Sequence, residues 1–171
     1  MMLDKNYADF AWDQTAALLA VDSPSGFTAR AAQWVQGAFE ALGCPAVIAR
    51  KGGVLAELGG EDANDALLLQ PRQEVLACSP LAADALLLEA HTDTLGAMVC
   101  QIKGNGRLKL TPLGGMNANN AEGENVKVYT RSGKVCEGTA QLCNASIHVN
   151  GDYNDTKRTF DTLEVVLDEN V

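Results

Sequence analysis

The chain has 171 residues, 47% hydrophobic and 20% charged, a composition typical of a globular protein with one or two domains. Thirteen basic and 22 acidic side chains give a formal net charge of −9, which argues against a surface that follows nucleic-acid phosphates. The longest apolar runs fall far short of the ~20 residues of a membrane-spanning helix, and the first residues show no signal-peptide pattern. We therefore expect a cytoplasmic protein without nucleic-acid or membrane partners.

The cysteines favour the same compartment. Their number is odd and none forms a CxxC pair, so free thiols in a reducing environment are expected rather than a disulfide framework. The five cysteines are Cys44, Cys78, Cys100, Cys136 and Cys143.

Two amphipathic helices are predicted at the start of the chain. Apolar side chains recur at helical spacing over residues 7–21, with Asp4 placed as the N-cap. The turn at residues 22–26 contains Pro and Gly and ends this helix. The second helix begins near Thr28 and stops at Gly43, a residue favoured after a helix C-terminus. We expect the apolar faces of both helices to pack in a core.

A near-repeat marks the middle of the chain. The run Asp-Ala-Leu-Leu-Leu occurs at residues 65–69 and again at residues 84–88. An apolar run without alternation is typical of a strand buried on both faces of a parallel sheet. The pattern alone leaves both copies, residues 65–69 and 84–88, as candidates for such a strand, and the segment around residues 66–84 is expected to contain an insertion.

Short strands and turns dominate the rest of the sequence. Helical periodicity disappears after Met98, and Asn105-Gly106 between alternating segments is a strong hairpin signal. The fold class is therefore α/β over residues 1–97, followed by an all-β part, a small β-barrel, over residues 98–171. Two pairs of expected strands flank a turn: residues 47–50 and 54–58 flank Lys51-Gly52-Gly53, and residues 126–130 and 134–141 flank Ser132-Gly133. The other expected strands are residues 98–103, 107–111, 146–149 and 162–167.

The sharpest chemical feature is Glu89-Ala90-His91-Thr92-Asp93, at the end of the expected buried strand. Ligands of open α/β sheets gather at the carboxyl ends of strands, and side chains at i and i+2 point the same way. His91 is therefore a candidate metal ligand, with Asp93 orienting its ring. A histidine hydrogen-bonded at a strand end, without a metal, is the alternative, because the tripeptide is common.

The stretch AHTDTLGAMV at residues 90–99 resembles the glutamyl-aminopeptidase/tetrahedral-aminopeptidase family of dimetal peptidases. The family motif His-x-Asp-x-x-Gly is matched by His91, Asp93 and Gly96. Residues 66–84 have no counterpart in the resemblance. The other matching stretches are DSPSGF at 22–27, RKGGVLAELGG at 50–60, TPLGGMNANN at 111–120 and ENVKVYTRSGKV at 124–135.

This resemblance implies the N-terminal part of an α/β peptidase catalytic domain at residues 1–97. Residues 98–171 would be an inserted β-barrel dimerisation domain and a return strand. The implied activity is removal of N-terminal residues from peptides by a metal-dependent aminopeptidase with two divalent ions, zinc or cobalt. By position, His91 would be a metal ligand and Asp93 the catalytic residue that orients it. A homo-oligomer formed through the barrel is also implied.

The chain departs from the family pattern in one respect. The family's bridging aspartate, its adjacent glutamate pair and its later ligands lie beyond the barrel, whereas this sequence ends at Val171. We therefore expect an N-terminal fragment that is inactive alone. The second histidine, His148, lies in an expected alternating strand, where we expect it to face solvent.

Two alternatives accompany this interpretation. In relatives without the barrel, the bridging aspartate follows soon after the His-x-Asp, and Asp155-Thr156-Lys157 superficially matches that pattern. Arg158-Thr159-Phe160 follow instead of the glycines that this pattern requires. The alternative function is a non-enzymatic β-barrel self-association module.

Overall fold

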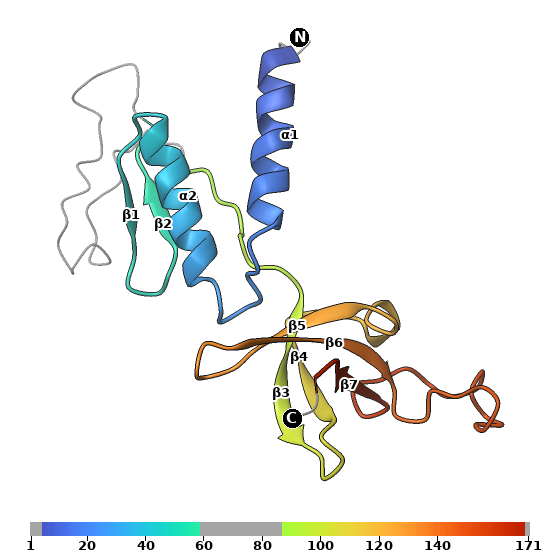
Figure 1. Cartoon of the computed structure of the whole chain (residues 1–171). Coiled ribbons are helices and arrows are strands. Elements are labelled where there is room, and N and C mark those ends of the chain that lie inside the picture. Colours follow the sequence, from blue (N-terminus) through green and yellow to red (C-terminus); the bar gives the residue numbers. More distant parts are fainter. Residues whose placement is uncertain (1–4, 59–86, 170–171) are drawn as a thin grey trace. The chain divides into compact units, whose positions relative to one another are not determined.

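The structure is a computed structural model that describes residues 5–58 and 87–169 (Figure 1). The chain divides into two compact units, Met1–Thr94 and Leu95–Val171. The described part of the first unit contains two helices and a small hairpin, and the second unit contains a larger antiparallel sheet. Several expected features lie outside the described residues: the N-cap Asp4, the first copy of the near-repeat, Cys78 and the insertion at residues 66–84.

Both helices expected at the start of the chain are present. Helix α1 spans Lys5–Leu19 and helix α2 spans Ala29–Ala41. Shortly after α2, the φ of Gly43 is 78°, and its N–H donates to the carbonyl of Glu40 at 2.9 Å. This left-handed conformation is the one that glycine adopts without strain, so the predicted stop of the second helix is confirmed.

A hairpin follows α2. Strand β1, Ala46–Ile48, pairs in antiparallel register with strand β2, Val54–Ala56. The N–H of Gly52 donates to the carbonyl of Ala49 at 2.8 Å and closes the turn. The hairpin predicted around Lys51-Gly52-Gly53 is therefore confirmed.

The apolar faces of the two helices differ in burial. Helix α2 lies alongside β1 and β2, and its Ala31 and Ala32 are buried (Figure 1). On α1, by contrast, Tyr7 and Phe10 are 69% and 46% exposed. An amphipathic stripe is buried only where another element covers it. The expectation that the α1 face packs in a core is therefore wrong for the residues that the structure describes.

The expected buried strand at residues 85–90 is also not borne out. Residues 87–93 belong to no strand, and Leu87 and Leu88 are 67% and 70% exposed. A strand of a parallel sheet needs paired neighbours and covering helices. In residues 5–58 and 87–94, the parallel pairing is a single isolated bridge between Pro24 and Thr94. A local apolar run does not contain the information on whether such partners are present.

The second unit is a five-stranded antiparallel sheet in the order β3-β4-β7-β6-β5. The hairpins predicted around Asn105-Gly106 and Ser132-Gly133 join β3 to β4 and β5 to β6. Strands β3 and β5 are the edges of this sheet over residues 95–169, so the barrel is not seen closed there. The elements are β3 (Gly96–Ile102), β4 (Leu108–Leu113), the 3₁₀ helix η1 (Ala118–Asn120), β5 (Asn125–Tyr129), β6 (Val135–Leu142) and β7 (Leu163–Leu167).

The strand expected at residues 146–149 is wrong. The N–H groups of Val149 and Asn150 both donate to the carbonyl of Ser146, at 3.1 and 2.8 Å. These local hydrogen bonds form a turn, and the backbone of residues 146–149 does not pair with the sheet. His148 lies in this turn and is exposed, as expected.

The core of the second unit lies on one face of the sheet and beneath η1. One cluster joins β4, β6 and β7, and a second joins η1 to the ends of β6 and β7. Phe160 packs against both clusters and connects them. The buried members are Leu108, Leu110, Ala140 and Val165 in the first cluster, and Ala118, Ala121, Leu142 and Leu163 in the second.

A buried carboxylate links strand β7 to the β3–β4 hairpin. Glu164 on β7 is 1% exposed. Its Oε2 accepts from Nζ of Lys103 at 2.7 Å, and its Oε1 pairs with the guanidinium of Arg107. Burial alone would raise the pKa of Glu164, but the hydrogen bonds from these two cations hold that pKa below its ordinary value. The carboxylate therefore stays charged and ties β7 to the β3–β4 hairpin.

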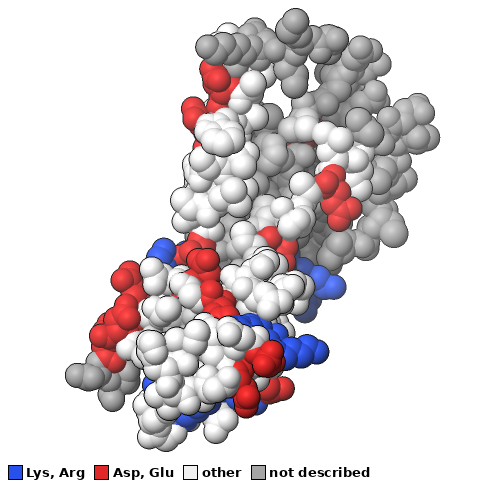
Figure 2. All heavy atoms as spheres, turned by 90° about the vertical axis from the view of Figure 1, so that its right-hand side faces the viewer, with Lys and Arg blue, Asp and Glu red and all other residues white. Residues whose placement is uncertain are grey.

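Figure 2 shows the charged side chains on one face of the molecule. On the face drawn in Figure 2, acidic and basic side chains both appear, and the coloured basic atoms form no continuous stripe. This pattern is in keeping with the net charge of −9. Among the helices of the described residues, none has both the length and the apolar character needed to cross a membrane.

Candidate functional site

The predicted site residues lie in a segment held against the turn between α1 and α2. Thr94 forms the parallel bridge with Pro24, and its N–H donates to the carbonyl of Ser23 at 2.8 Å. In Figure 1 the segment before β3 passes beside this turn. Residues 22–27 and 91–94, far apart in the sequence, are therefore neighbours within the first unit.

The structure brings His91 and Asp93 into contact. Nδ1 of His91 lies 3.1 Å from Oδ1 of Asp93 and 3.1 Å from the Asp93 carbonyl oxygen. Both oxygens are acceptors, so Nδ1 is the donor in this contact, and in a neutral imidazole with this tautomer the lone pair lies on Nε2. The His91 side chain is 86% exposed. The contact therefore uses Nδ1 and leaves Nε2 of this exposed ring as the nitrogen that could bind a ligand.

Asp93 has a second donor. Oγ of Ser25 donates to Oδ2 of Asp93 at 2.5 Å, so the two carboxylate oxygens are held by different side chains. The Ser25 hydrogen bond, followed by that from His91, lowers the pKa of Asp93 from its ordinary value. Asp93 is therefore a carboxylate at neutral pH, the form that orients an imidazolium or a metal-bound imidazole.

Ser25 is the functional candidate that sequence reasoning missed. It lies in the DSPSGF stretch, to which no chemical role was assigned. The contact joins residues 68 positions apart, so no spacing rule connects them. The signal available in the sequence was the turn itself, since a Pro-Ser-Gly turn fixes where its serine lies.

A single imidazole does not make a metal site. In residues 5–58 and 87–169, no group of three or more His, Cys, Asp or Glu side chains is arranged so that it could hold a metal ion. His148 and Asp155 lie in turns of the second unit. The four cysteines that the structure describes are free thiols. A neutral Nε2 with a carboxylate on Nδ1 is the usual form of one zinc ligand, so His91 and Asp93 fit one ligand of such a site.

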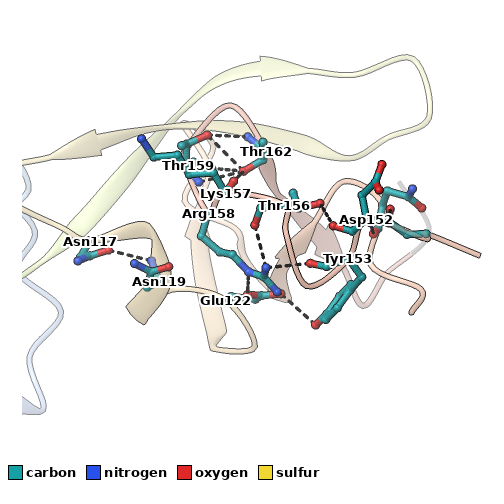
Figure 3. Close-up of polar contacts among 12 residues, drawn as sticks. Asn117, Asn119, Glu122, Asp152, Tyr153, Thr156, Lys157, Arg158, Thr159 and Thr162 are labelled. Atoms are coloured by element: carbon teal, nitrogen blue, oxygen red, sulfur yellow. Dashed lines mark hydrogen bonds and ion pairs between the residues drawn. The ribbon is translucent and has the colours of Figure 1, made fainter. Parts of the chain in front are cut away.

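A second polar cluster, in the loop between β6 and β7, is structural. Nε of Arg158 donates to Oε2 of Glu122 at 2.7 Å, and the hydroxyl of Tyr153 donates to Oε1 at 3.3 Å (Figure 3). Arg158 also donates to the carbonyls of Tyr153 and Thr156. Its hydrogen bond holds the pKa of Glu122 below the ordinary value. The bonds to the two carbonyls lie within the loop, and the bonds to Glu122 fix the loop against the segment after η1.

Three kinds of comparison relate this chain to known proteins. Residues 76–171 match the profile of the family described as M42 glutamyl aminopeptidase. The chain is 34% identical over 154 residues to the putative aminopeptidase YhfE of Bacillus subtilis (strain 168), a match covering 90% of this chain and 39% of that protein. It is 25% identical over 123 residues to a glutamyl aminopeptidase of Lactococcus lactis subsp. cremoris (strain MG1363), covering 72% of this chain and 30% of that protein. The chain thus spans less than half the length of these relatives.

Solved structures share the fold at lower identity. The TET aminopeptidase from the marine sediment archaeon Thaumarchaeota archaeon SCGC AB-539-E09 matches with a TM-score of 0.69 and 21% identity, over 95% of this chain and 39% of that one. The PhTET1-12s dodecamer matches with a TM-score of 0.66 and 16% identity, over 92% and 39%. At these identities the matches establish likeness of fold.

Proposed function

Since the chain belongs to the M42 glutamyl aminopeptidase family, we propose that it is the N-terminal portion of a metal-dependent aminopeptidase that removes N-terminal residues from peptides. The observation that carries the proposal at the site is the contact of His91 Nδ1 with Asp93 Oδ1 at 3.1 Å. This contact prepares Nε2 as a ligand for a divalent metal.

Each residue of the pair has a distinct role in this proposal. His91 holds one of two divalent ions, zinc or cobalt, through Nε2. Asp93 keeps the proton on Nδ1, orients the ring and increases its basicity. When bound, the metal supplies Lewis-acid chemistry at the scissile carbonyl of the peptide.

The donors that the described residues bring together are too few for catalysis. A catalytic zinc takes about three protein ligands, and two ions need more. The described residues supply one oriented imidazole, that of His91, and contain no cluster of three donors that could hold a metal ion. We therefore propose that the chain alone binds metal weakly and has no aminopeptidase activity. The remaining ligands and a general base would come from a C-terminal part.

The two parts of the chain expected from the sequence have different tasks in this scheme. Residues 1–97 belong to the catalytic domain, and residues 98–171 form a barrel-type dimerisation domain. Strand β3 supports the second assignment, because it is an edge strand whose Met98 and Ile102 are 56% and 72% exposed. Exposed apolar edges are suited to pairing with a second copy. The free thiols of the described cysteines favour a cytoplasmic location.

Peptide hydrolysis tests the proposal. The 171-residue chain is compared with an extended protein, in which the chain continues through the coding sequence beyond Val171. Release of N-terminal residues from short peptides is measured with added zinc or cobalt. We expect no turnover by the short chain, turnover by the extended protein, and loss of that turnover in His91→Ala.

Two outcomes would contradict the proposal. Turnover by the short chain would show that its own donors suffice and would return attention to Asp155 as a bridging ligand. An extended protein without activity would favour the alternative, a self-association module.

A further inference from the structure

We propose that Ser25 is a positioning residue of this site: its hydroxyl fixes the Asp93 carboxylate so that His91 keeps its proton on Nδ1 and offers Nε2 to the metal. The inference rests on the proposed function for the identity of the ligand. The arrangement itself lies wholly within the first unit, on side chains 68 positions apart.

The geometry assigns one oxygen of Asp93 to each neighbour. Oδ2 accepts from Ser25 Oγ at 2.5 Å, and Oδ1 lies 3.1 Å from His91 Nδ1. The terminal torsion of an aspartate is broad and roughly two-fold, so a carboxylate without a second anchor rotates readily. When the hydroxyl holds Oδ2, the rotation of the carboxylate is restricted and Oδ1 stays directed toward the imidazole.

Exposure makes this anchor necessary. The Asp93 side chain is 40% exposed and the His91 side chain is 86% exposed, so water competes for both partners of their hydrogen bond. The hydroxyl occupies one carboxylate oxygen and thereby reduces the competition at the other.

The backbone places Ser25 independently of any metal. The bridge between Pro24 and Thr94 and the bond from Thr94 N–H to the Ser23 carbonyl hold the turn against the site segment. Next to Ser25, Gly26 has a φ of 85°, and Phe27 N–H closes the turn on the Pro24 carbonyl at 2.7 Å. The hydroxyl is therefore organised before ligand binding, as expected of a group that supports a metal ligand.

Ser23 provides a matched control. It lies in the same turn and is 1% exposed, and its hydroxyl has no hydrogen-bond partner within the described residues. Its contact with the site segment uses the backbone carbonyl, which a substitution leaves in place. Ser23→Ala therefore removes a hydroxyl from the same turn without touching Asp93.

The experiment reads the tautomer of His91 directly. The 171-residue chain is labelled with ¹⁵N, and the ring nitrogens of its two histidines are followed by long-range ¹H–¹⁵N correlation, first without metal and then during titration with zinc chloride. His148, exposed in a turn of the second unit, is the internal reference. The variants are Ser25→Ala, Ser25→Thr and Ser23→Ala.

We expect His91 of the unaltered chain to populate the Nδ1–H tautomer and to be the histidine that zinc perturbs at Nε2. Ser25→Ala should shift His91 toward a mixture of tautomers and weaken zinc binding at His91 about 10-fold, the lower end of the effect of losing such a supporting partner. Ser25→Thr, which keeps the hydroxyl, should restore both values. Ser23→Ala and the His148 signals should not change.

Ser25→Ala with the tautomer and zinc affinity of the unaltered chain would overturn the inference, provided that Asp93→Asn changes both. The same is true if Ser23→Ala has as large an effect as Ser25→Ala. If Ser25→Ala does not fold, Ser25→Cys, with a much weaker donor, is held to the same criteria. The metal-free tautomer separates this inference from the proposed function, because it is measured whether or not the extended protein hydrolyses peptides.

Discussion

Nδ1 of His91 lies 3.1 Å from Oδ1 of Asp93, and the other contact of that nitrogen is also with an acceptor, the Asp93 carbonyl oxygen. Replacing Asp93 by Asn keeps the shape but supplies an amide that can donate to Nδ1. The opposite tautomer then becomes favourable, and zinc binding at His91 should weaken about 10- to 100-fold. Zinc titration followed by NMR of the His91 ring measures this loss.

The control for Asp93→Asn is Asp9→Asn, the same chemical change at an exposed position of α1. It should leave the zinc affinity of His91 unchanged. Equal affinities in the Asp93 variant and the unaltered chain would show that Asp93 does not orient the ligand.

Glu164→Gln should destabilise the second unit. The carboxylate is 1% exposed and is held by Lys103 and Arg107, so the amide leaves two cations without their counter-charge. Because both cations reach solvent, we expect a loss of about 1–3 kcal/mol in the free energy of unfolding, measured with urea. Glu169→Gln, which breaks the exposed pair with Lys134, should cost at most about 1 kcal/mol. Equal losses in the two variants would refute the role of burial.

The same carboxylate predicts a pH dependence. Burial works against the charged form, but the hydrogen bonds from its two cations leave the pKa of Glu164 below the ordinary 4.5 in the folded chain. The unfolded state therefore binds the proton first, so the stabilisation from Glu164 is complete above about pH 4.5 and is lost as pH falls through the lower folded pKa. Urea unfolding between about pH 3 and pH 7 should show a steeper acid loss in the unaltered chain than in Glu164→Gln. Parallel profiles would contradict this assignment.

Gly138→Ala should destabilise the sheet. Gly138 on β6 pairs with Leu167 on β7, and an added Cβ would overlap the carbonyl oxygen of Val166 and lie 3.1 Å from the Leu167 Cα. Backbone atoms in paired strands cannot move far to relieve the overlap, so we expect the free energy of unfolding, measured with urea, to fall by about 1–3 kcal/mol. Gly151→Ala, which meets no atom within 4 Å, should change stability little. A neutral Gly138→Ala would mean that β6 and β7 separate without penalty.

Two glycines of the first unit should respond to alanine with opposite signs. Gly26 has a φ of 85°, so Gly26→Ala is strained even though an added Cβ meets no atom within 4 Å, and it should cost about 1–2 kcal/mol. Gly37 lies inside α2 with equal free space, and Gly37→Ala should stabilise by about 0.5–1 kcal/mol. Thermal unfolding of the two variants measures the difference. A stabilising Gly26→Ala would contradict the turn that places Ser25.

Local chemistry explains which parts of the fold the sequence predicted. The hairpins at Lys51-Gly52-Gly53 and Asn105-Gly106 were predicted because a few adjacent residues determine a turn. Two strand predictions were wrong: the buried strand that includes Leu87 and Leu88, and the strand at residues 146–149. Burial and strand pairing depend on distant partners, which a local pattern does not contain.

The candidate site divides along the same line. His91 and Asp93 are two positions apart, so their spacing was enough to predict the contact, while their roles stay predictions. The Ser25 hydroxyl reaches Asp93 because the backbone bridge between Pro24 and Thr94 holds two distant segments side by side. No pattern of residue types encodes that bridge, which only the folded chain reveals.

The most direct measurement is anomalous diffraction at the zinc edge from crystals of the extended protein grown with zinc. The account predicts a zinc peak about 2.0–2.1 Å from Nε2 of His91, with Nδ1 still bonded to Asp93 and Oδ2 of Asp93 bonded to Ser25. A zinc ion bound elsewhere with His91 free, or a peak at Nδ1 with the contact to Asp93 broken, would contradict it.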